Sequence, residues 1–192
     1  MLTIDFENVY SCMRSSIDVR RIYFHASTSE NKLVQLLIKI DPMNNPAFKG
    51  CNILSFGPLK STGEVDTLIR IKYLHVGKVL STVLFEAWSF LRENPEYYLI
   101  VDGSTELRTI LYHQILKNNR SYLELFFKPI GIDYYVRRKR DKTYERDVNG
   151  ALLPKPMFQK FDYERTKYYL YMYYALKLNE DIANMLIKTN SL

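Results

Sequence analysis

The first third of the chain alternates hydrophobic and polar residues, and a period of two predicts β-strands. Residues 21–27 alternate in this way, and residues 32–40 place four aliphatic side chains on one side. Two further strands are expected at residues 51–56 and 64–74, because a turn-forming stretch with two glycines and a proline separates them. This part of the sequence therefore predicts a meander of four strands.

The clearest helix begins at Val76. From there hydrophobic residues recur every three or four positions for more than four turns, which is typical of a helix with one buried side. Pro95 ends this pattern. A short hydrophobic strand is expected at residues 97–101, a second helix at 106–117, and extended structure again at 123–136.

The composition changes after residue 136. Residues 137–156 combine basic residues with two prolines and an Asn-Gly pair, so a basic loop and linker is expected there. Residues 163–187 place hydrophobic side chains at helical spacing. The predicted fold is α+β, a mostly antiparallel sheet with two central helices. It divides into a core domain (1–136), the linker and a C-terminal helical extension (157–192).

The composition is that of an ordinary globular domain, with 192 residues, 47% hydrophobic and 25% charged. The two cysteines, Cys12 and Cys51, lie far apart and there are only three histidines, so neither a disulfide framework nor a metal site is expected. No stretch has the length of a membrane-spanning helix, and the first twenty residues lack the hydrophobic block of a signal peptide. We expect a cytoplasmic protein without a membrane partner and without a cofactor.

Lysine and arginine exceed aspartate and glutamate by 27 to 21, a net charge of +6. Four consecutive basic residues, Arg137, Arg138, Lys139 and Arg140, contribute to this excess, and tyrosines that are suited to stacking on bases lie nearby. Contacts between such residues and phosphates release counterions. We expect this run to bind nucleic acid or an acidic protein, and the alternative is a solvated loop.

A glycine at the first helix and a Leu-Tyr pair on the second resemble the central half of the GNAT acyltransferase fold. In that family a strand, a CoA-binding turn and helix, a strand, and a helix with a Leu-Tyr pair follow one another. The resemblance covers residues 64–132. It implies that Gly77 and Lys78 bind the pyrophosphate of acetyl-CoA and that Tyr112 protonates the leaving thiolate. Val79 departs from the family's turn, which has Gly or Ala at this position.

Residues 103–112 carry Gly-Ser-Thr, two residues, Arg-Thr, one residue and Leu-Tyr, a motif similar to that of an uncharacterised bacterial family. Ser104 and Thr105 at a helix N-terminus, with Arg108 one turn later, are expected to bind an anion such as phosphate. The alternative is an ordinary N-cap followed by an exposed arginine. Arg108 and His113 also have the spacing of the catalytic pair of HEPN ribonucleases.

The chain contains sixteen tyrosines, and several fall in the expected C-terminal helix. Tyr168, Tyr169 and Tyr173 lie outside the side of that helix that would pack on the domain. Tyrosine is common in interfaces, so these three are expected to contact a second copy or a partner protein. The alternative is a helix folded wholly onto its own domain.

Two functions follow from these observations. The first is a bacterial cytoplasmic binding protein with a basic surface, one half of a toxin–antitoxin or defence pair. The second is a GNAT-like acyltransferase with an altered CoA turn. Residues 75–80 distinguish the two, since backbone N–H groups open to a cleft favour the enzyme and a plugged turn favours the binding protein.

Overall fold

The computed structural model describes residues 2–14, 20–66, 69, 71–102, 105–182 and 184. Its strands are β1 (Met13–Arg14), β2 (Arg21–Ser27), β3 (Leu33–Pro42), β4 (Cys51–Pro58), β5 (Tyr98–Asp102), β6 (Phe127–Val136), β7 (Pro154–Lys160) and β8 (Tyr173–Leu178). Its helices are α1 (Val76–Glu93), α2 (Glu106–Asn118), α3 (Arg120–Leu123) and the short 3₁₀ helix η1 (Pro46–Phe48).

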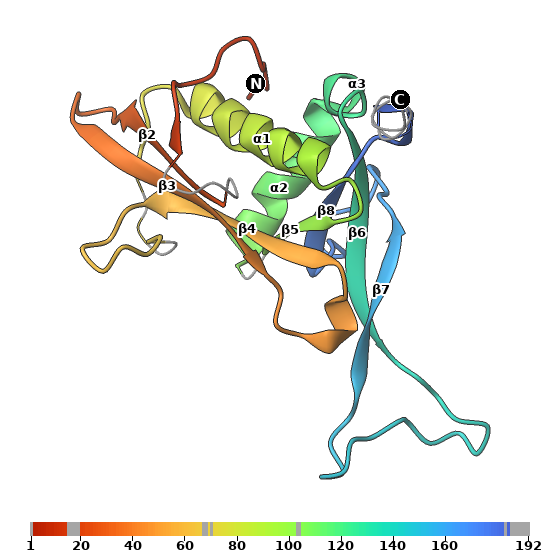
Figure 1. Cartoon of the computed structure of the whole chain (residues 1–192). Coiled ribbons are helices and arrows are strands. Elements are labelled where there is room, and N and C mark those ends of the chain that lie inside the picture. Colours follow the sequence, from red (N-terminus) through yellow and green to blue (C-terminus); the bar gives the residue numbers. More distant parts are fainter. Residues whose placement is uncertain are drawn as a thin grey trace.

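In the described part of the chain the strands form one eight-stranded sheet in the order β1-β2-β3-β4-β5-β8-β6-β7 (Figure 1). Neighbouring strands are antiparallel except β4 and β5, which are parallel. The chain reaches β5 from β4 through α1, and its last strand returns between β5 and β6. The expected α+β class with a mostly antiparallel sheet is confirmed.

The main core lies between one face of the sheet and helices α1 and α2, since both helices contribute to the same buried cluster. Helix α1 buries six of the side chains that the spacing predicted, Val79, Leu80, Val83, Leu84, Ala87 and Leu91. It buries Phe90 as well, whereas Val76 in the first turn is exposed. The opposite face of the sheet carries a smaller cluster around Phe48 of η1. The two faces of the sheet are therefore covered unequally.

The strand expected at residues 64–74 is wrong. Of its described residues, Val65 makes an isolated bridge to Leu59 and Tyr73 makes one to Thr28, and the segment otherwise forms a connection between β4 and α1. Thr67, Leu68 and Arg70 lie outside the described residues. The described residues of this alternating segment thus form two single bridges and no continuous ladder.

The C-terminal helix expected over 163–187 is wrong as far as residue 178, because residues 173–178 form β8 in the centre of the sheet. Residues 183 and 185–187 of the expected helix lie outside the described residues. Tyr174, Ala175 and Leu176 are buried. Both sides of a central strand are covered, so its sequence is nearly continuously hydrophobic and mimics a buried helix. Tyrosine also favours strands over helices. The sheet thus includes a strand from the expected C-terminal extension.

Strand β7 begins within the expected linker (137–156), which includes its Pro154 and Pro156, and ends within the expected C-terminal extension. It pairs only with β6 and forms the edge of the sheet, where a proline removes no ladder hydrogen bond on its open side. Beyond this pair the chain continues outward as an arm.

Candidate functional sites

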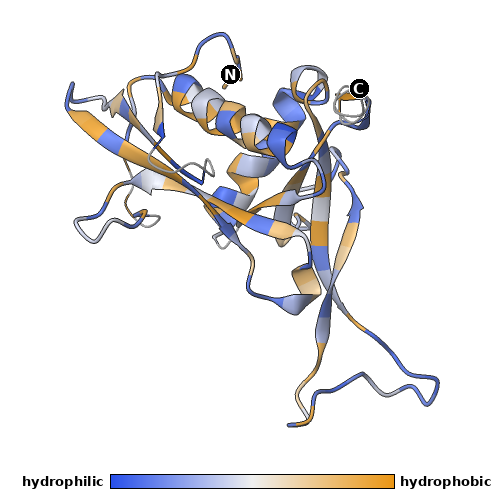
Figure 2. Ribbon diagram, in the orientation of Figure 1, coloured by the Kyte–Doolittle hydropathy of each residue, from blue (hydrophilic) through white to orange (hydrophobic). Residues whose placement is uncertain are grey.

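The most prominent feature of the molecule is an arm formed by residues 134–158. It comprises the outer parts of β6 and β7 and the chain between them, and it projects away from the body (Figure 1). The four predicted basic residues, Arg137, Arg138, Lys139 and Arg140, lie along it and are all exposed. In Figure 2 the outer arm is mainly hydrophilic on its way out, with hydrophobic residues on the return toward β7.

Two tight turns shape the end of the arm. In the first, the backbone N–H of Lys139 bonds to the Thr143 carbonyl and Lys142 has a positive φ of 69°. In the second, the N–H of Asp147 bonds to the Ala151 carbonyl, and Gly150 has a φ of 80°, where glycine is favoured. The basic loop expected at residues 137–156 thus contains two tight turns, and its last three residues begin β7.

The arm contains seven Lys and Arg against three acidic residues, so it holds four of the chain's six net positive charges. Each acidic side chain is engaged within the arm. Asp141 accepts hydrogen bonds from Thr143, Asp147 accepts from the backbone N–H groups of Asn149 and Ala151, and Glu145 pairs with Lys155 at 2.8 Å.

These bonds stabilise the carboxylates. The hydrogen bonds from Thr143 hold the pKa of Asp141 below its usual value, and the bond from Lys155 lowers the pKa of Glu145. Among the described residues, the side chains of Arg137, Lys139 and Arg140 form no ion pair with these acids. The arm therefore presents an exposed basic surface.

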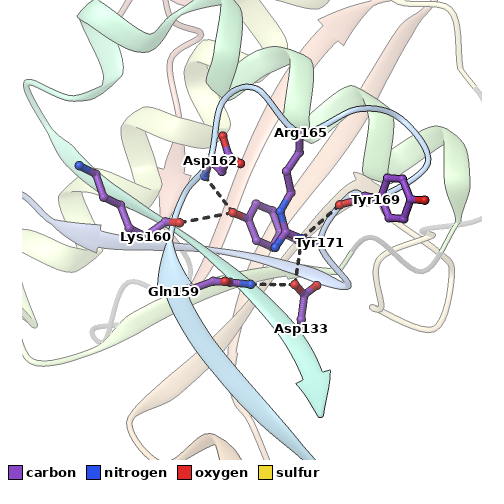
Figure 3. Close-up of polar contacts among 7 residues, drawn as sticks. All are labelled: Asp133, Gln159, Lys160, Asp162, Arg165, Tyr169 and Tyr171. Carbon is purple, nitrogen blue, oxygen red and sulfur yellow. Dashed lines mark hydrogen bonds and ion pairs between the residues drawn. The ribbon is translucent and has the colours of Figure 1, made fainter.

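The root of the arm is held by a polar network on one face of β6 and β7 (Figure 3). Asp133 accepts hydrogen bonds from Gln159 at 2.7 Å and from Arg165 at 2.8 Å. The Arg165 guanidinium lies 3.6 Å from the ring centroid of Tyr171, a cation–π contact. The Tyr171 hydroxyl accepts from the backbone N–H of Asp162 and donates to the Lys160 carbonyl. This network fixes the segment 161–172 against the root of the arm.

A second candidate site is a cleft between β4 and β5. The two strands pair at only three positions, from Cys51 with Tyr98 to Ile53 with Ile100, and then part. The cavity beside them has a volume of about 590 Å³. Its lining is mainly hydrophobic, with polar groups from Asp66, Tyr73, Arg108, Tyr112 and Tyr173. Such a mixture suits a small organic ligand.

The structure brings two of the predicted site residues together in this cleft. Tyr112 and Arg108, one turn apart on α2, both line it and are half-buried. Thr105 is the N-cap of α2, because its hydroxyl accepts a hydrogen bond from the Arg108 backbone N–H at 3.4 Å. Ser104 and Gly103 lie outside the described residues. The anion-site prediction is therefore untested at Ser104, while Thr105 has a capping role.

Gly77 and Lys78 lie elsewhere, in a separate hollow at the start of α1. An N-terminal strap, residues 2–12, crosses this end of the helix. A Cβ at Gly77 would stand 3.1 Å from the Thr3 carbonyl oxygen, and the Asp5 side chain lines the same hollow. A carbonyl oxygen and a carboxylate repel a pyrophosphate. Val79 does not plug the turn, since it is buried in the core.

The strap is held by side chains of α1 and of the α2–α3 junction. Ser81 accepts a hydrogen bond from the backbone N–H of Asp5, and Thr82 accepts from that of Tyr10. Asn119 accepts from the Ile4 N–H at 2.8 Å and donates to the Leu2 carbonyl at 3.2 Å. The N-terminus of α1 and Tyr112 on α2 thus belong to different surfaces.

The three predicted interface tyrosines are separated by the structure. Tyr168 and Tyr169 are 78% and 75% exposed on the segment before β8, not on a helix. Tyr173 is half-buried in β8, with its ring centroid 5.8 Å from that of Phe48. His113 is buried against Phe161, whereas Arg108 lines the cleft, so these two do not form one site.

Two other findings concern membrane-spanning helices and metal sites. No helix among the described residues is long and hydrophobic enough to cross a membrane. Over the same residues, no group of three His, Cys, Asp or Glu side chains is placed to hold a metal ion. The cleft and the arm are the features that sequence reasoning did not assemble, although the basic run and Tyr112 were visible signals for them.

Neither the curated proteins nor the solved structures contain a match to this chain. The model of a family of unknown function, DUF6934, matches residues 7–150, three quarters of the sequence. This range covers the sheet up to β6 and much of the arm. The chain belongs to this family of unknown function, DUF6934.

Proposed function

We propose that this protein binds nucleic acid and that the arm makes the contact. The observation that carries the proposal is the concentration of four net positive charges in a projecting two-stranded arm whose acidic side chains are already engaged. Each lysine or arginine that contacts a phosphate releases a counterion, so such a surface gains affinity for a polyanion.

The exposed aromatic side chains of the arm support nucleic acid rather than an acidic protein, because aromatic rings stack on bases. Among the eighteen large hydrophobic side chains that the described residues expose, seven lie on the arm. They include Tyr144 and Phe158, 50% and 39% exposed. Aromatic rings beside guanidinium groups can contact bases and phosphates together. A role in a toxin–antitoxin or defence pair remains part of this proposal.

The test is the salt dependence of binding. Fluorescence anisotropy measures the affinity of the full chain for a labelled oligonucleotide, single-stranded and as a duplex, over a range of salt concentrations. The variant replaces Arg137, Arg138, Lys139 and Arg140 by Ala. For this variant the plot of log affinity against log salt concentration should become less steep. The magnitude of its slope should decrease by about 0.7 for each lost phosphate contact on a single strand, or by about 3 if all four residues contact phosphate.

The control removes the same charge from the body. Lys32, Lys49, Lys60 and Lys72 are exposed and lie outside the arm, so their replacement by Ala should leave the slope nearly unchanged. If the slope decreased equally in both variants, net charge alone, and not the arm, would account for the salt dependence. Absence of binding to either form of the oligonucleotide by the wild-type chain would refute the proposal.

A second candidate function is acyl transfer of the GNAT kind. It is favoured by the succession of β4, α1, β5 and α2 and by the cleft beside the parted strands, which Tyr112 lines. The hydroxyl of Tyr112 would supply the proton to a leaving thiolate. In this arrangement the Thr3 carbonyl and the Asp5 carboxylate would repel a pyrophosphate at Gly77.

Thermal unfolding with acetyl-CoA tests this second function. A ligand that binds only the folded protein raises the melting temperature with its concentration. If the cleft holds the ligand, Arg108→Ala should reduce this rise and Lys78→Ala should not. The reverse pattern would place the ligand at the start of α1. No rise at millimolar acetyl-CoA would exclude CoA as a ligand.

A further inference from the structure

The pairing register gives the arm two chemically different faces. Residues opposite each other in an antiparallel pair share a face, and successive residues alternate. Tyr134 pairs with Pro156 in the β6–β7 ladder, and two isolated bridges join Arg138 with Tyr144 and Arg146 with Leu152. The face shared by these residues is called the aromatic face here; its side chains are Tyr134, Val136, Arg138, Tyr144, Arg146, Leu152 and Phe158.

The aromatic face carries no acidic residue. Tyr144 and Leu152 are 50% and 49% exposed on it, and Phe158 is 39% exposed. At its root this face continues into the cluster around Phe48, whose ring centroid lies 6.0 Å from that of Phe158. The face therefore offers exposed rings along the arm, with one end anchored in the body.

Two arginines are fixed beside these rings. Arg138 donates a hydrogen bond from Nε to the Lys142 carbonyl, and Arg146 donates to the Gly150 carbonyl. Both residues are exposed, and both bonds go to neutral carbonyl oxygens. Their positive charges remain available to an anion at the positions that the turns impose.

The opposite face of the arm is different. It carries the ion pair between Glu145 and Lys155, and at its root Asp133 is covered by Arg165 and the segment 161–172. Tyr135, 45% exposed, lies on this face because it pairs with Lys155. The paired strand residues of the arm therefore carry a carboxylate on this face and none on the aromatic face.

The side chains of the aromatic face select a form of nucleic acid. A duplex offers phosphates and the edges of its base pairs, which polar side chains read by hydrogen bonding. The flat faces of bases are accessible only where bases are unpaired, and there they stack on aromatic side chains. From these observations, and resting on the proposed function, we infer that the arm binds single-stranded nucleic acid by stacking unpaired bases on Tyr144 and Phe158.

A second copy of the chain is a less suitable occupant of this face. The chain outside the arm contains 20 basic and 18 acidic residues, so it offers the basic arm no net opposite charge. Two arms brought together by a two-fold axis would repel each other. Charge complementarity favours the polyanion.

The test compares aromatic residues on the two faces of the arm. Affinities of the full chain for fluorescently labelled oligothymidine and for a duplex of the same length are measured by anisotropy at one salt concentration. Tyr144→Ala and Phe158→Ala should each weaken binding of oligothymidine about tenfold, the effect of losing one stacked base, and should change duplex binding less than twofold. Tyr135→Ala, on the opposite face, should change neither.

The outcomes separate this inference from the function on which it rests. Duplex binding as tight as single-strand binding, or equal losses from Tyr135→Ala and Tyr144→Ala, would overturn the stacking inference and leave nucleic-acid binding intact. No binding of either probe would overturn both. Light scattering that shows a dimer dissociated by Tyr144→Ala, without binding of either probe, would assign the face to a second copy and would overturn both as well.

Discussion

Gly131→Ala is the substitution with the most sharply defined structural cost. Gly131 lies on β6 at the root of the arm, under the ring of Tyr171. A Cβ at this position would stand 2.1 to 2.3 Å from three ring carbons, far inside van der Waals contact. The ring has little freedom to move, since its hydroxyl bonds to Asp162 and Lys160 and Arg165 lies over its face.

The expected decrease in the free energy of unfolding follows from this lack of freedom. Overpacking in a rigid site costs about 1–3 kcal/mol, and we expect the upper end, about 3 kcal/mol. For a domain of this length, that corresponds to a melting temperature lower by roughly 6–12 °C. Urea unfolding followed by the fluorescence of Trp88, the single tryptophan, gives the free energy directly.

A double-mutant cycle isolates the cause. Tyr171→Ala removes a buried ring and should cost about 3–5 kcal/mol by itself. In that background Gly131→Ala should cost close to nothing, because the clashing ring is gone. If the two costs instead add to within about 0.5 kcal/mol, the ring does not lie over Gly131 and the described root of the arm is incorrect.

Three further predictions concern the core, the strap and the exposed tyrosines. Burial lowers the pKa of His113, so below the ordinary pKa of histidine the unfolded state binds more protons than the folded state. The free energy of unfolding should therefore be constant above about pH 6.5 and fall on acidification by at most about 1.4 kcal/mol per pH unit. His113→Phe should remove this dependence in urea titrations, and a wild-type chain as stable at pH 5 as at pH 7 would contradict the prediction. Asn119→Ala leaves the buried N–H of Ile4 without its acceptor and should cost about 1–3 kcal/mol, with faster hydrogen exchange confined to the strap if the loss is local. Replacing Tyr168 and Tyr169 by Ser should shift any dimer seen by light scattering toward monomer without changing the melting temperature, whereas a lower melting temperature would mean that the two rings support the fold.

Several elements could be predicted because local sequence and tertiary environment agree there. Strand β2 has one face in the core and one outside, so its alternation is visible in the sequence. Helix α1 buries one side from Val79 to Leu91. In both cases a single chain segment contains the complete pattern.

The wrong expectations arose where the environment is set by distant residues. Strand β8 looks helical because β5 and β6 flank it and both of its faces are covered, and that position depends on the strand order. Strand β7 is compatible with two prolines only because it is an edge strand. No local signal in the sequence reports either neighbour.

The candidate sites divide in the same way. The basic run was visible in the sequence, but the placement of Glu145 and Tyr144 on opposite faces of the arm required the pairing register. Tyr112 was singled out by a resemblance, yet the cleft that it lines results from the parting of β4 and β5 after three paired positions.

Photo-crosslinking shows which residues of the chain contact a bound oligonucleotide, and so whether the arm holds it. Oligothymidine is crosslinked to the full wild-type chain by ultraviolet light, and the modified peptides are identified by mass spectrometry. If the arm holds the oligonucleotide, the crosslinks should lie within residues 134–158, with Tyr144 and Phe158 among the modified residues. Crosslinks confined to the body, for example at the cleft lined by Arg108 and Tyr112, would contradict it.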